Sequence, residues 1–455
     1  MKPTPACRSR VMRALRPFML LLGVSCQFAF AGNQADISGR VIDDAGHPVA
    51  DAAVMIYHAG PVTGYSLFCP SCYADCGKRA LTDHDGRFAF HHLKQGLWFE
   101  LLVAKAGYEP KFGGKVNPTT GAFVKTELER RPSISNSGRA FHGLVVDSHG
   151  LPQADAVVQP VGGLWDPKTG TILFGSVPGL DPVAVTNSRG VFEIDSFAPE
   201  RKMMLPFVGP PLSILVTVEA RGMAEKFSTV PAGQEAQRIT VMDGDVVRGR
   251  LVRDGKPVAG AEVGLIGYPR GIWGPGFKLT GSPYDEIRIG TRSDGSFEID
   301  NVPVPGNWYV YAKMESVAAR GATGNVRCST QENGKVLDIG DLALKPGYRV
   351  QGRVVLSDGK SIPDGMRVTI SAQEAWDSQT LMLPPGGEFA FAGLAAGSYS
   401  IFASVKGYSP GVAPVSFKAG DGRLHSYTPP PPPISIRSNV DGLTLTLHPD
   451  AAPNP

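Results

Sequence analysis

The residue types best suited to chemistry in this chain are cysteines gathered in one short segment. Cys69, Cys72 and Cys76 lie together in a stretch rich in Pro, Gly and polar residues, and Cys328 is distant from them in sequence. In an oxidising compartment, the default for such a cluster is a disulfide that staples a long loop. Because the cluster holds an odd number of cysteines, one thiol either pairs elsewhere, with Cys328 as the candidate, or stays reduced.

The same thiols admit a metal or a redox interpretation. Closely spaced thiolates suit zinc or copper, and His84, His91 and His92 follow closely enough to act as further ligands. However, no second CxxC completes a zinc pattern. A redox CxxC normally opens a helix that lowers the thiol pKa, and no helical pattern flanks this one. We therefore expect no cofactor, with a metal at the cysteine loop as the alternative to a disulfide.

Aromatic rings at similar positions of an internal repeat form the second candidate site. A planar ring on an exposed loop can stack on a sugar face, and loops at the end of a sandwich commonly bind ligands. The alternative is that each ring plugs the open end of its own domain. The rings concerned are Trp165, Trp273, Trp376 and Tyr65. Trp98 and Trp308 fall in predicted strands, so we expect both in the core.

Signatures of enzymes are mostly absent from the sequence. None of the His residues has a Glu three positions later, as a zinc carboxypeptidase requires, and there is no HExxH, GxSxG or phosphate-binding Gly loop. We therefore predict that the chain has no catalytic residues and is not an enzyme.

Four copies of one pattern determine the predicted fold. Each copy begins with a short apolar segment that contains a glycine, and the copies are spaced by just over a hundred residues. A polar turn with Gly follows in each copy and leads into a strand that begins with Phe, as in Thr82-Asp83-His84-Asp85-Gly86-Arg87-Phe88. The first-strand glycines are Gly39, Gly143, Gly249 and Gly352.

Short alternating strands, regular turns and a module of this length predict a β-sandwich for each copy. No segment has a helical apolar period with caps. The expected fold is all-β, with four tandem sandwiches. The predicted organisation is a signal peptide (1–31), repeat 1 with the cysteine loop (32–132), repeat 2 (136–243), repeat 3 (244–345), repeat 4 (346–418) and a Pro-rich tail with a short hairpin (419–455).

These motifs resemble the carboxypeptidase regulatory-like domain. That family has a transthyretin-like (prealbumin-like), broadly Ig-like sandwich and is related to bacterial Cna-B-type surface modules. The resemblance rests on the G-x-V opening, the T-D-x-x-G-x-F hairpin and a later Gly-Tyr, here Gly107-Tyr108 and Gly407-Tyr408, and it covers nearly all of 36–418. It implies a fold rather than one activity, because the family hosts many functions. Repeat 3 lacks the closing Gly-Tyr.

The N-terminus predicts export. A basic start precedes the apolar Phe18 to Val24, and Ala29-Phe30-Ala31 offers small residues at a cleavage site. Without 1–31 the chain has 40 Lys and Arg against 42 Asp and Glu, a net charge of 40 − 42 = −2. This balance gives no reason to expect a nucleic-acid partner. No later apolar run reaches the length of a transmembrane helix.

The preferred hypothesis is a binding scaffold that is periplasmic, on the outer surface or extracellular. Its modules would form a rod that presents several weak sites to a glycan or to a surface or periplasmic protein. The second hypothesis is a metal or redox accessory protein that uses the Cys69, Cys72 and Cys76 loop. The ligand, the oligomeric state and the angle between modules are left open by the sequence.

Overall fold

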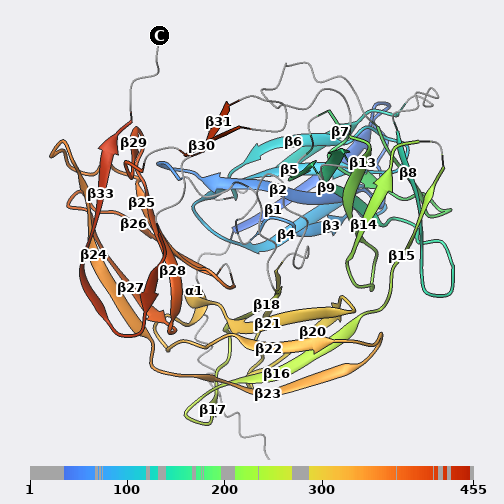
Figure 1. Ribbon diagram of the computed structural model, residues 1–455. Coiled ribbons are helices and arrows are strands. Elements are labelled where there is room, and N and C mark those ends of the chain that lie inside the picture. Colours follow the sequence, from blue (N-terminus) through green and yellow to red (C-terminus); the bar gives the residue numbers. More distant parts are fainter. Residues whose placement is uncertain are drawn as a thin grey trace, which may run out of the picture.

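The computed structural model describes residues 35–450 except 67–69, 71, 72, 74, 119–122, 132–139, 167–170, 176, 178, 196–210, 234, 269–285, 376, 413, 414, 419–423 and 428–431. The predicted signal peptide (1–31) lies outside the described residues. The described chain consists of strands and turns with one short helix, α1 (Met314–Val317). The predicted all-β fold of tandem sandwiches is confirmed (Figure 1).

Repeat 1 is a seven-stranded sandwich. Its strands are β1 (Ala35–Asp43), β2 (Ala53–Pro61), β3 (Arg79–Leu81), β4 (Arg87–Leu93), β5 (Leu97–Ala104), β6 (Lys111–Val116) and β7 (Phe123–Leu128). One sheet has the order β4-β1-β7 and the other β3-β2-β5-β6. β1 pairs antiparallel with β4 and parallel with β7. Alternate side chains of both sheets, such as Phe90 and Phe99, fill the space between them.

Repeats 2 and 3 use the same arrangement. In repeat 2 the sheets are β12-β8-β15 and β10-β9-β13-β14, with β11 paired to β9. Its strands are β8 (Phe141–Val146), β9 (Val157–Asp166), β10 (Thr171–Phe174), β11 (Ala184–Val185), β12 (Val191–Ile194), β13 (Ser213–Glu219), β14 (Lys226–Pro231) and β15 (Gln237–Thr240).

Repeat 3 contains β16 (Asp245–Arg253), β17 (Lys256–Pro257), β18 (Glu262–Gly267), β19 (Ile287–Gly290), β20 (Ser296–Val302), β21 (Gly306–Ala312), β22 (Val326–Thr330) and β23 (Val336–Leu344). Its second sheet is β19-β18-β21-β22.

Repeat 4 extends beyond its predicted end at residue 418. Its strands are β24 (Tyr348–Leu356), β25 (Arg367–Ala372), β26 (Ser378–Met382), β27 (Glu388–Leu394), β28 (Gly397–Ser404), β29 (Tyr408–Ser409), β32 (Ile434–Ile436) and β33 (Val440–Pro449), and β30 (Val415–Lys418) pairs separately with β31 (Leu424–Tyr427). The hairpin predicted in the tail is wrong, because β33 pairs parallel with β24 while β32 pairs with β28 in the other sheet. The parallel β33 therefore fills the place that β7 has in repeat 1.

The repeated glycine of the first strand lies opposite the repeated phenylalanine in all four sandwiches. The opposed pairs are Gly39 with Phe88, Gly143 with Phe192, Gly249 with Phe297 and Gly352 with Phe389. A Cβ atom on Gly143 would lie only 2.1 Å from Cε1 of Phe192, so the ring occupies the space that a side chain would need. The glycine thus lets the ring lie flat on the neighbouring strand, which fixes the register of the two strands.

A threonine at the start of the hairpin turn connects the two sheets in three of the repeats. In repeat 1 the Thr82 hydroxyl accepts from the amide of Ala52 at 2.8 Å and donates to the carbonyl of Val49 at 2.7 Å. Thr186 and Thr291 make the same two hydrogen bonds in repeats 2 and 3. All three hydroxyls are buried, so each hydrogen bond satisfies a backbone group that water cannot reach.

Of the two tryptophans predicted in the core, Trp308 is there and Trp98 is not. Trp308 is fully buried and donates from Nε1 to Thr330 at 2.9 Å. Trp98 is half-buried on the outer face of β5, where the Lys115 ammonium lies 4.1 Å from its ring centroid. Counted from the glycine that precedes each tryptophan, the first core side chain is the next residue in β5 (Leu97) but the second residue in β21 (Trp308). A shift of one residue exchanges the two faces of a strand, so Trp98 points outward.

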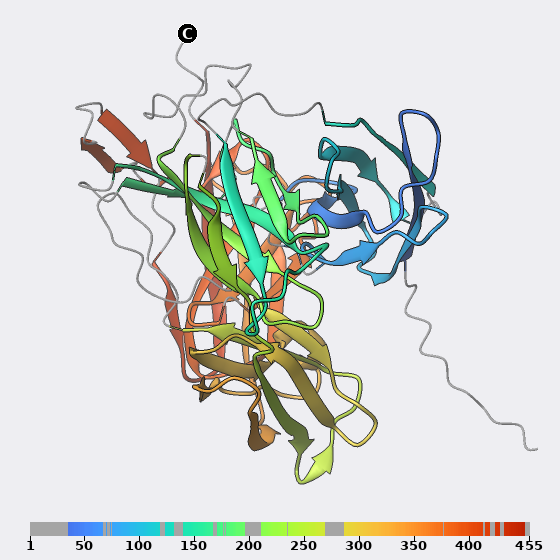
Figure 2. The ribbon, with the colours of Figure 1, turned by 90° about the vertical axis from the view of Figure 1, so that its right-hand side faces the viewer.

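The four repeats cluster around a common centre and do not form the expected rod (Figures 1 and 2). The outer face of repeat 1 packs on repeat 2 through Met55 and Leu102 against Val157 and Val183. Repeat 2 contacts repeat 3, because Asn301 Nδ2 donates to the carbonyl of Gly222 at 2.9 Å. Repeat 4 contacts both repeat 3 and repeat 1, as described below. The expectation of a rod is therefore corrected.

We predict that Gly143→Ala destabilises repeat 2 by about 1–3 kcal/mol, because its methyl group would displace the Phe192 ring. Amide hydrogen exchange in β8 and β12 measures this cost in the intact chain. Gly290→Ala is the control, since a Cβ on this strand glycine meets nothing within 4 Å. In a Phe192→Leu background the cost of Gly143→Ala should shrink. Strictly additive costs would contradict the proposed contact.

Candidate functional site

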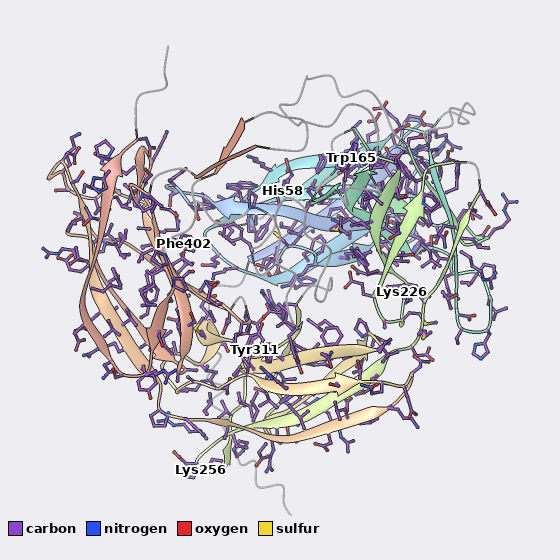
Figure 3. The ribbon with its side chains drawn as sticks, viewed as in Figure 1. His58, Trp165, Lys226, Lys256, Tyr311 and Phe402 are labelled. Carbon is purple, nitrogen blue, oxygen red and sulfur yellow. The ribbon has the colours of Figure 1, made fainter. Side chains whose placement is uncertain are left out.

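Repeats 3 and 4 meet through an aromatic face of β21. Tyr309 and Tyr311 project from the side of β21 opposite Trp308 and, together with Ile266, pack against Ala375 of repeat 4. The Tyr311 hydroxyl donates to the carbonyl of Ala375 at 2.9 Å. Figure 3 shows Tyr311 on the side of this sheet that faces the centre of the assembly. Because successive side chains of β21 point to opposite faces, one set packs in the core of repeat 3 and the other set forms the interface with repeat 4.

Charged groups are buried directly beside this aromatic contact. Lys313 Nζ lies 2.9 Å from Glu286 Oε1 and 3.0 Å from Asp377 Oδ1 of repeat 4. Asp377 Oδ1 is buried and has no hydrogen-bond partner in the described structure, so its attraction to Lys313 is coulombic. The other carboxylate oxygen, Oδ2, accepts from the amide of Met314 at 2.7 Å. Lys313 and Asp377 are 6% and 3% exposed, so solvent screens this ion pair little.

The two carboxylates around Lys313 differ in acidity. Burial raises the pKa of Asp377 above its ordinary value, and the Lys313 charge offsets this only in part. Burial also acts to raise the pKa of Glu286, but Lys313, Arg288 and the Tyr311 hydroxyl outweigh it and lower that pKa. Glu286 is therefore the firmer counter-ion of Lys313. Asp377 joins the two repeats through its ion pair with Lys313 and its hydrogen bond to the Met314 amide.

Repeat 1 closes the assembly by contacting repeat 4 backbone to backbone. A Cβ on Gly64 would lie 2.0 Å from the carbonyl oxygen of Gly365, and the Tyr65 amide donates to that oxygen at 3.2 Å. The Arg367 guanidinium donates to the carbonyls of Gly365 at 2.9 Å and Thr63 at 3.0 Å. Glycine at both positions allows the two loops to approach this closely.

Repeat 1 also contacts repeat 3, through α1. Lys94 Nζ donates to both carboxylate oxygens of Glu315, at 2.7 and 2.8 Å. The Lys94 amide is held in turn by Asp75 Oδ2 at 2.8 Å, at the end of the cysteine loop. α1 follows β21 where repeats 1 and 4 have their Gly-Tyr turn, so the missing Gly-Tyr of repeat 3 gives way to the helix that carries Glu315.

A cavity of about 460 Å³ lies where repeats 1, 3 and 4 meet, and we call it the junction cavity. Its charged lining residues are Lys94, Arg288, Lys313, Arg367 and Glu315. The hydroxyl-bearing residues Thr63, Ser66, Tyr73, Ser378 and Thr380 also line it, together with the apolar Pro61, Leu97 and Met382. This volume is typical of small-molecule sites, and most of the described lining residues are polar.

Two of the aromatic residues predicted from the sequence are described, and neither is an exposed ring. Trp165, labelled in Figure 3, packs against the core of repeat 2, and a Cβ on Gly163 would lie 2.8 Å from its ring. Tyr65 is half-buried and packs against the core of repeat 4. Trp165 thus lies against the core of its own repeat, as the alternative expects, whereas Tyr65 lies against another repeat. Trp273 and Trp376 lie outside the described residues.

The predicted cysteine site is described only in part. Cys69 and Cys72 lie outside the described residues, so the disulfide and metal alternatives both stay predictions. Cys76 Sγ donates to the carbonyl of Pro70 at 3.3 Å. Cys328 lies in β22 and carries a thiol rather than a disulfide, and burial raises its pKa to about 11. Within the described ranges, no three His, Cys, Asp or Glu side chains gather closely enough to hold a metal ion.

The junction residues were not singled out from the sequence. Lys313, Asp377 and Arg367 stand in ordinary polar contexts, and their proximity depends on how separate sandwiches dock. One usable signal existed, which is the loss of Gly-Tyr in repeat 3 and its replacement by Lys313, Met314 and Glu315. A repeat that departs from its siblings at one turn marks a position with a different task.

Comparisons with known proteins agree with a β-sandwich class. The model of the second β-sandwich domain of BOS complex subunit NOMO1-like proteins matches residues 346–424, which is most of repeat 4. None of the curated proteins gives a significant match. No helix in the described part of the chain is long and apolar enough to cross a membrane. The fold thus defines the chain as a tandem β-sandwich protein.

Three of the solved structures that are similar to this chain come from proteins of different kinds. The Bacillus anthracis TIE protein is 10% identical, with 92% of this chain and 75% of that chain covered and a TM-score of 0.18. A streptococcal ancillary pilin is 12% identical, with 69% and 100% covered and a TM-score of 0.20. The 3-chlorocatechol 1,2-dioxygenase of Rhodococcus opacus is 17% identical, with 22% and 61% covered and a TM-score of 0.17. At these scores none of them bears on function.

We predict that Gly64→Ala loosens the contact between repeats 1 and 4, whereas Gly114→Ala does not. Both glycines have φ of +80°, so alanine meets the same backbone strain at each, but only Gly64 has a neighbour within 4 Å. Hydrogen exchange in residues 362–368 of repeat 4 is the readout, because it lies outside the substituted module. Equal exchange in the two variants would contradict a tight contact.

We predict that Cys328 reacts slowly with iodoacetamide in the folded protein. A thiol pKa of about 11 leaves about a hundredfold less thiolate at pH 8 than the ordinary pKa of 9.0 does. Peptide mapping after timed alkylation, with the urea-unfolded chain as the control, measures the difference. Alkylation of Cys328 at equal rates in both states would show that the thiol is exposed.

Proposed function

We propose that this chain is an exported, non-catalytic binding scaffold whose four sandwiches hold one another in a fixed, closed arrangement. The observation that carries the proposal is the burial of paired charges between repeats. Lys313 and Asp377 join repeats 3 and 4, and Arg131 lies 2.8 Å from the buried Asp181 where repeats 1 and 2 adjoin. Buried charges are costly unless they are well paired, so such contacts favour one relative orientation of the modules over others.

The partner under this proposal is a glycan or a protein of the periplasm or cell surface. The predicted signal peptide and the resemblance to carboxypeptidase regulatory-like modules support export. The match of repeat 4 to a NOMO1-like sandwich domain supports a structural role, although a shared fold alone does not define an activity. A periplasmic, outer-surface or extracellular location is equally compatible with these features.

Retention of the mature chain, residues 32–455, on a panel of immobilised polysaccharides and cell-envelope fractions tests the proposal. We expect saturable binding to at least one of them, with the length of any bound polysaccharide unchanged after prolonged incubation. Shortening of the polysaccharide would reveal an enzyme and overturn the proposal. Failure to bind every polysaccharide and every envelope fraction would also overturn it.

The two tryptophans predicted in loops, Trp273 and Trp376, allow a test of sugar stacking by substitution. If Trp273 and Trp376 stack on sugars, the double variant Trp273→Ala/Trp376→Ala should lower retention on a bound polysaccharide at least about tenfold, since each stacking contact contributes about 1 kcal/mol or more. Trp98→Ala is the control, because this half-buried ring lies on a sheet face and not in a loop. Undiminished retention of the double variant would exclude stacking by these rings.

A further inference from the structure

Among the described residues, one of the four cations that line the junction cavity has no carboxylate within ion-pairing distance. Lys94 is paired with Glu315. Lys313 and Arg288 are balanced together by Glu286 and Asp377. Arg367 is the remaining cation, and no described carboxylate lies within ion-pairing distance of it. A cation without a paired carboxylate in a partly enclosed site favours an anionic ligand.

Arg367 is held in position and still has donors to offer. Its hydrogen bonds go to the backbone carbonyls of Gly365, Thr63 and Tyr65 through Nη1 and Nη2, which leaves Nε unused. Burial lowers the pKa of this guanidinium, because carbonyl dipoles replace water only in part. An anion placed beside it would supply the missing charge compensation, and a carboxylate matches the planar fork of a guanidinium.

The remaining lining indicates what else the ligand contains. Ser378 and Thr380 belong to β26, Ser66 precedes the cysteine loop, and Tyr73 lies within it. These hydroxyls line a cavity that also has apolar patches at Leu97 and Met382. Hydroxyls beside apolar patches suit a molecule with its own hydroxyl groups and C–H faces. The volume of about 460 Å³ accommodates a ligand of one or two sugar rings.

We infer that the junction cavity binds a hydroxyl-rich monocarboxylate of the uronic acid type, with its carboxylate at Arg367. This inference rests on the proposed function and names the ligand class of the scaffold. The ligand would touch residues of repeats 1, 3 and 4 together, so binding would also stabilise the closed arrangement. A phosphate dianion fits less well, because it would bring two negative charges to one unpaired cation.

Calorimetric titration of the mature chain with glucuronic acid and with its methyl glycoside tests the inference. Glucose and inorganic phosphate are the comparison ligands. We expect binding of the uronates and at least tenfold weaker binding of glucose and phosphate. Glucose binding as tight as glucuronate, phosphate binding that is tighter, or no uronate binding at all would overturn the inference.

Two pairs of variants localise the binding. Arg367→Gln should weaken glucuronate binding at least tenfold, whereas Arg349→Gln, an exposed arginine of the same repeat that pairs with Asp441, should not. Because Arg367 also supports the contact with repeat 1, Ser378→Asp provides an independent test by placing a negative charge in the cavity. Its control is Ser361→Asp, at an exposed position of repeat 4. Unchanged affinity in Ser378→Asp, with its thermal transition intact, would place the ligand elsewhere.

The outcomes separate this inference from the proposed function. Retention on neutral polysaccharides or envelope fractions without uronate binding would remove the inference and leave the scaffold. Loss of all binding in every format would remove both.

Discussion

The first three sandwiches depend on the contact between the glycine of the first strand and the phenylalanine ring opposite. The ring can lie on the neighbouring strand only because the glycine has no side chain, and once it does so the register of the strand pair is fixed. Register decides which side chains face the core and which face outward. The outward faces are then available for docking, as Met55 and Leu102 are in repeat 1. The internal geometry of each module therefore precedes, and permits, the assembly of the four.

The interfaces between repeats combine apolar contacts with buried charge pairs. Between repeats 1 and 2 the contact is largely aliphatic, with Arg131 and Asp181 at its side. Between repeats 3 and 4 the contact combines tyrosine rings with Lys313, Glu286 and Asp377. Apolar area supplies most of the attraction, while paired charges disfavour other orientations because an unpaired buried charge is costly. The junction cavity is the space left where three such bodies meet.

The sequence was sufficient for the parts of the structure that repeat. Gly143 and Phe192, or Gly249 and Phe297, recur at fixed positions, so the strands and the sandwich could be predicted from local patterns. The strand β33 was misassigned because the alternation of Leu443, Leu445 and Leu447 is the same in a hairpin as in an inserted parallel strand. The Lys313 and Asp377 pair was missed because docking between separate modules leaves no periodic signal in either of them.

The central claim is that the four repeats form one closed body and not a flexible or linear string. Small-angle X-ray scattering of the mature chain in dilute solution tests it most directly. A compact body of this length has a radius of gyration of about 22 Å, and the account predicts a value near it with a single-peaked distance distribution. Four modules in a line, each with a radius of gyration of about 13 Å, would roughly double the value for the whole chain and extend the distribution. That result would contradict the closed arrangement and, with it, the junction cavity.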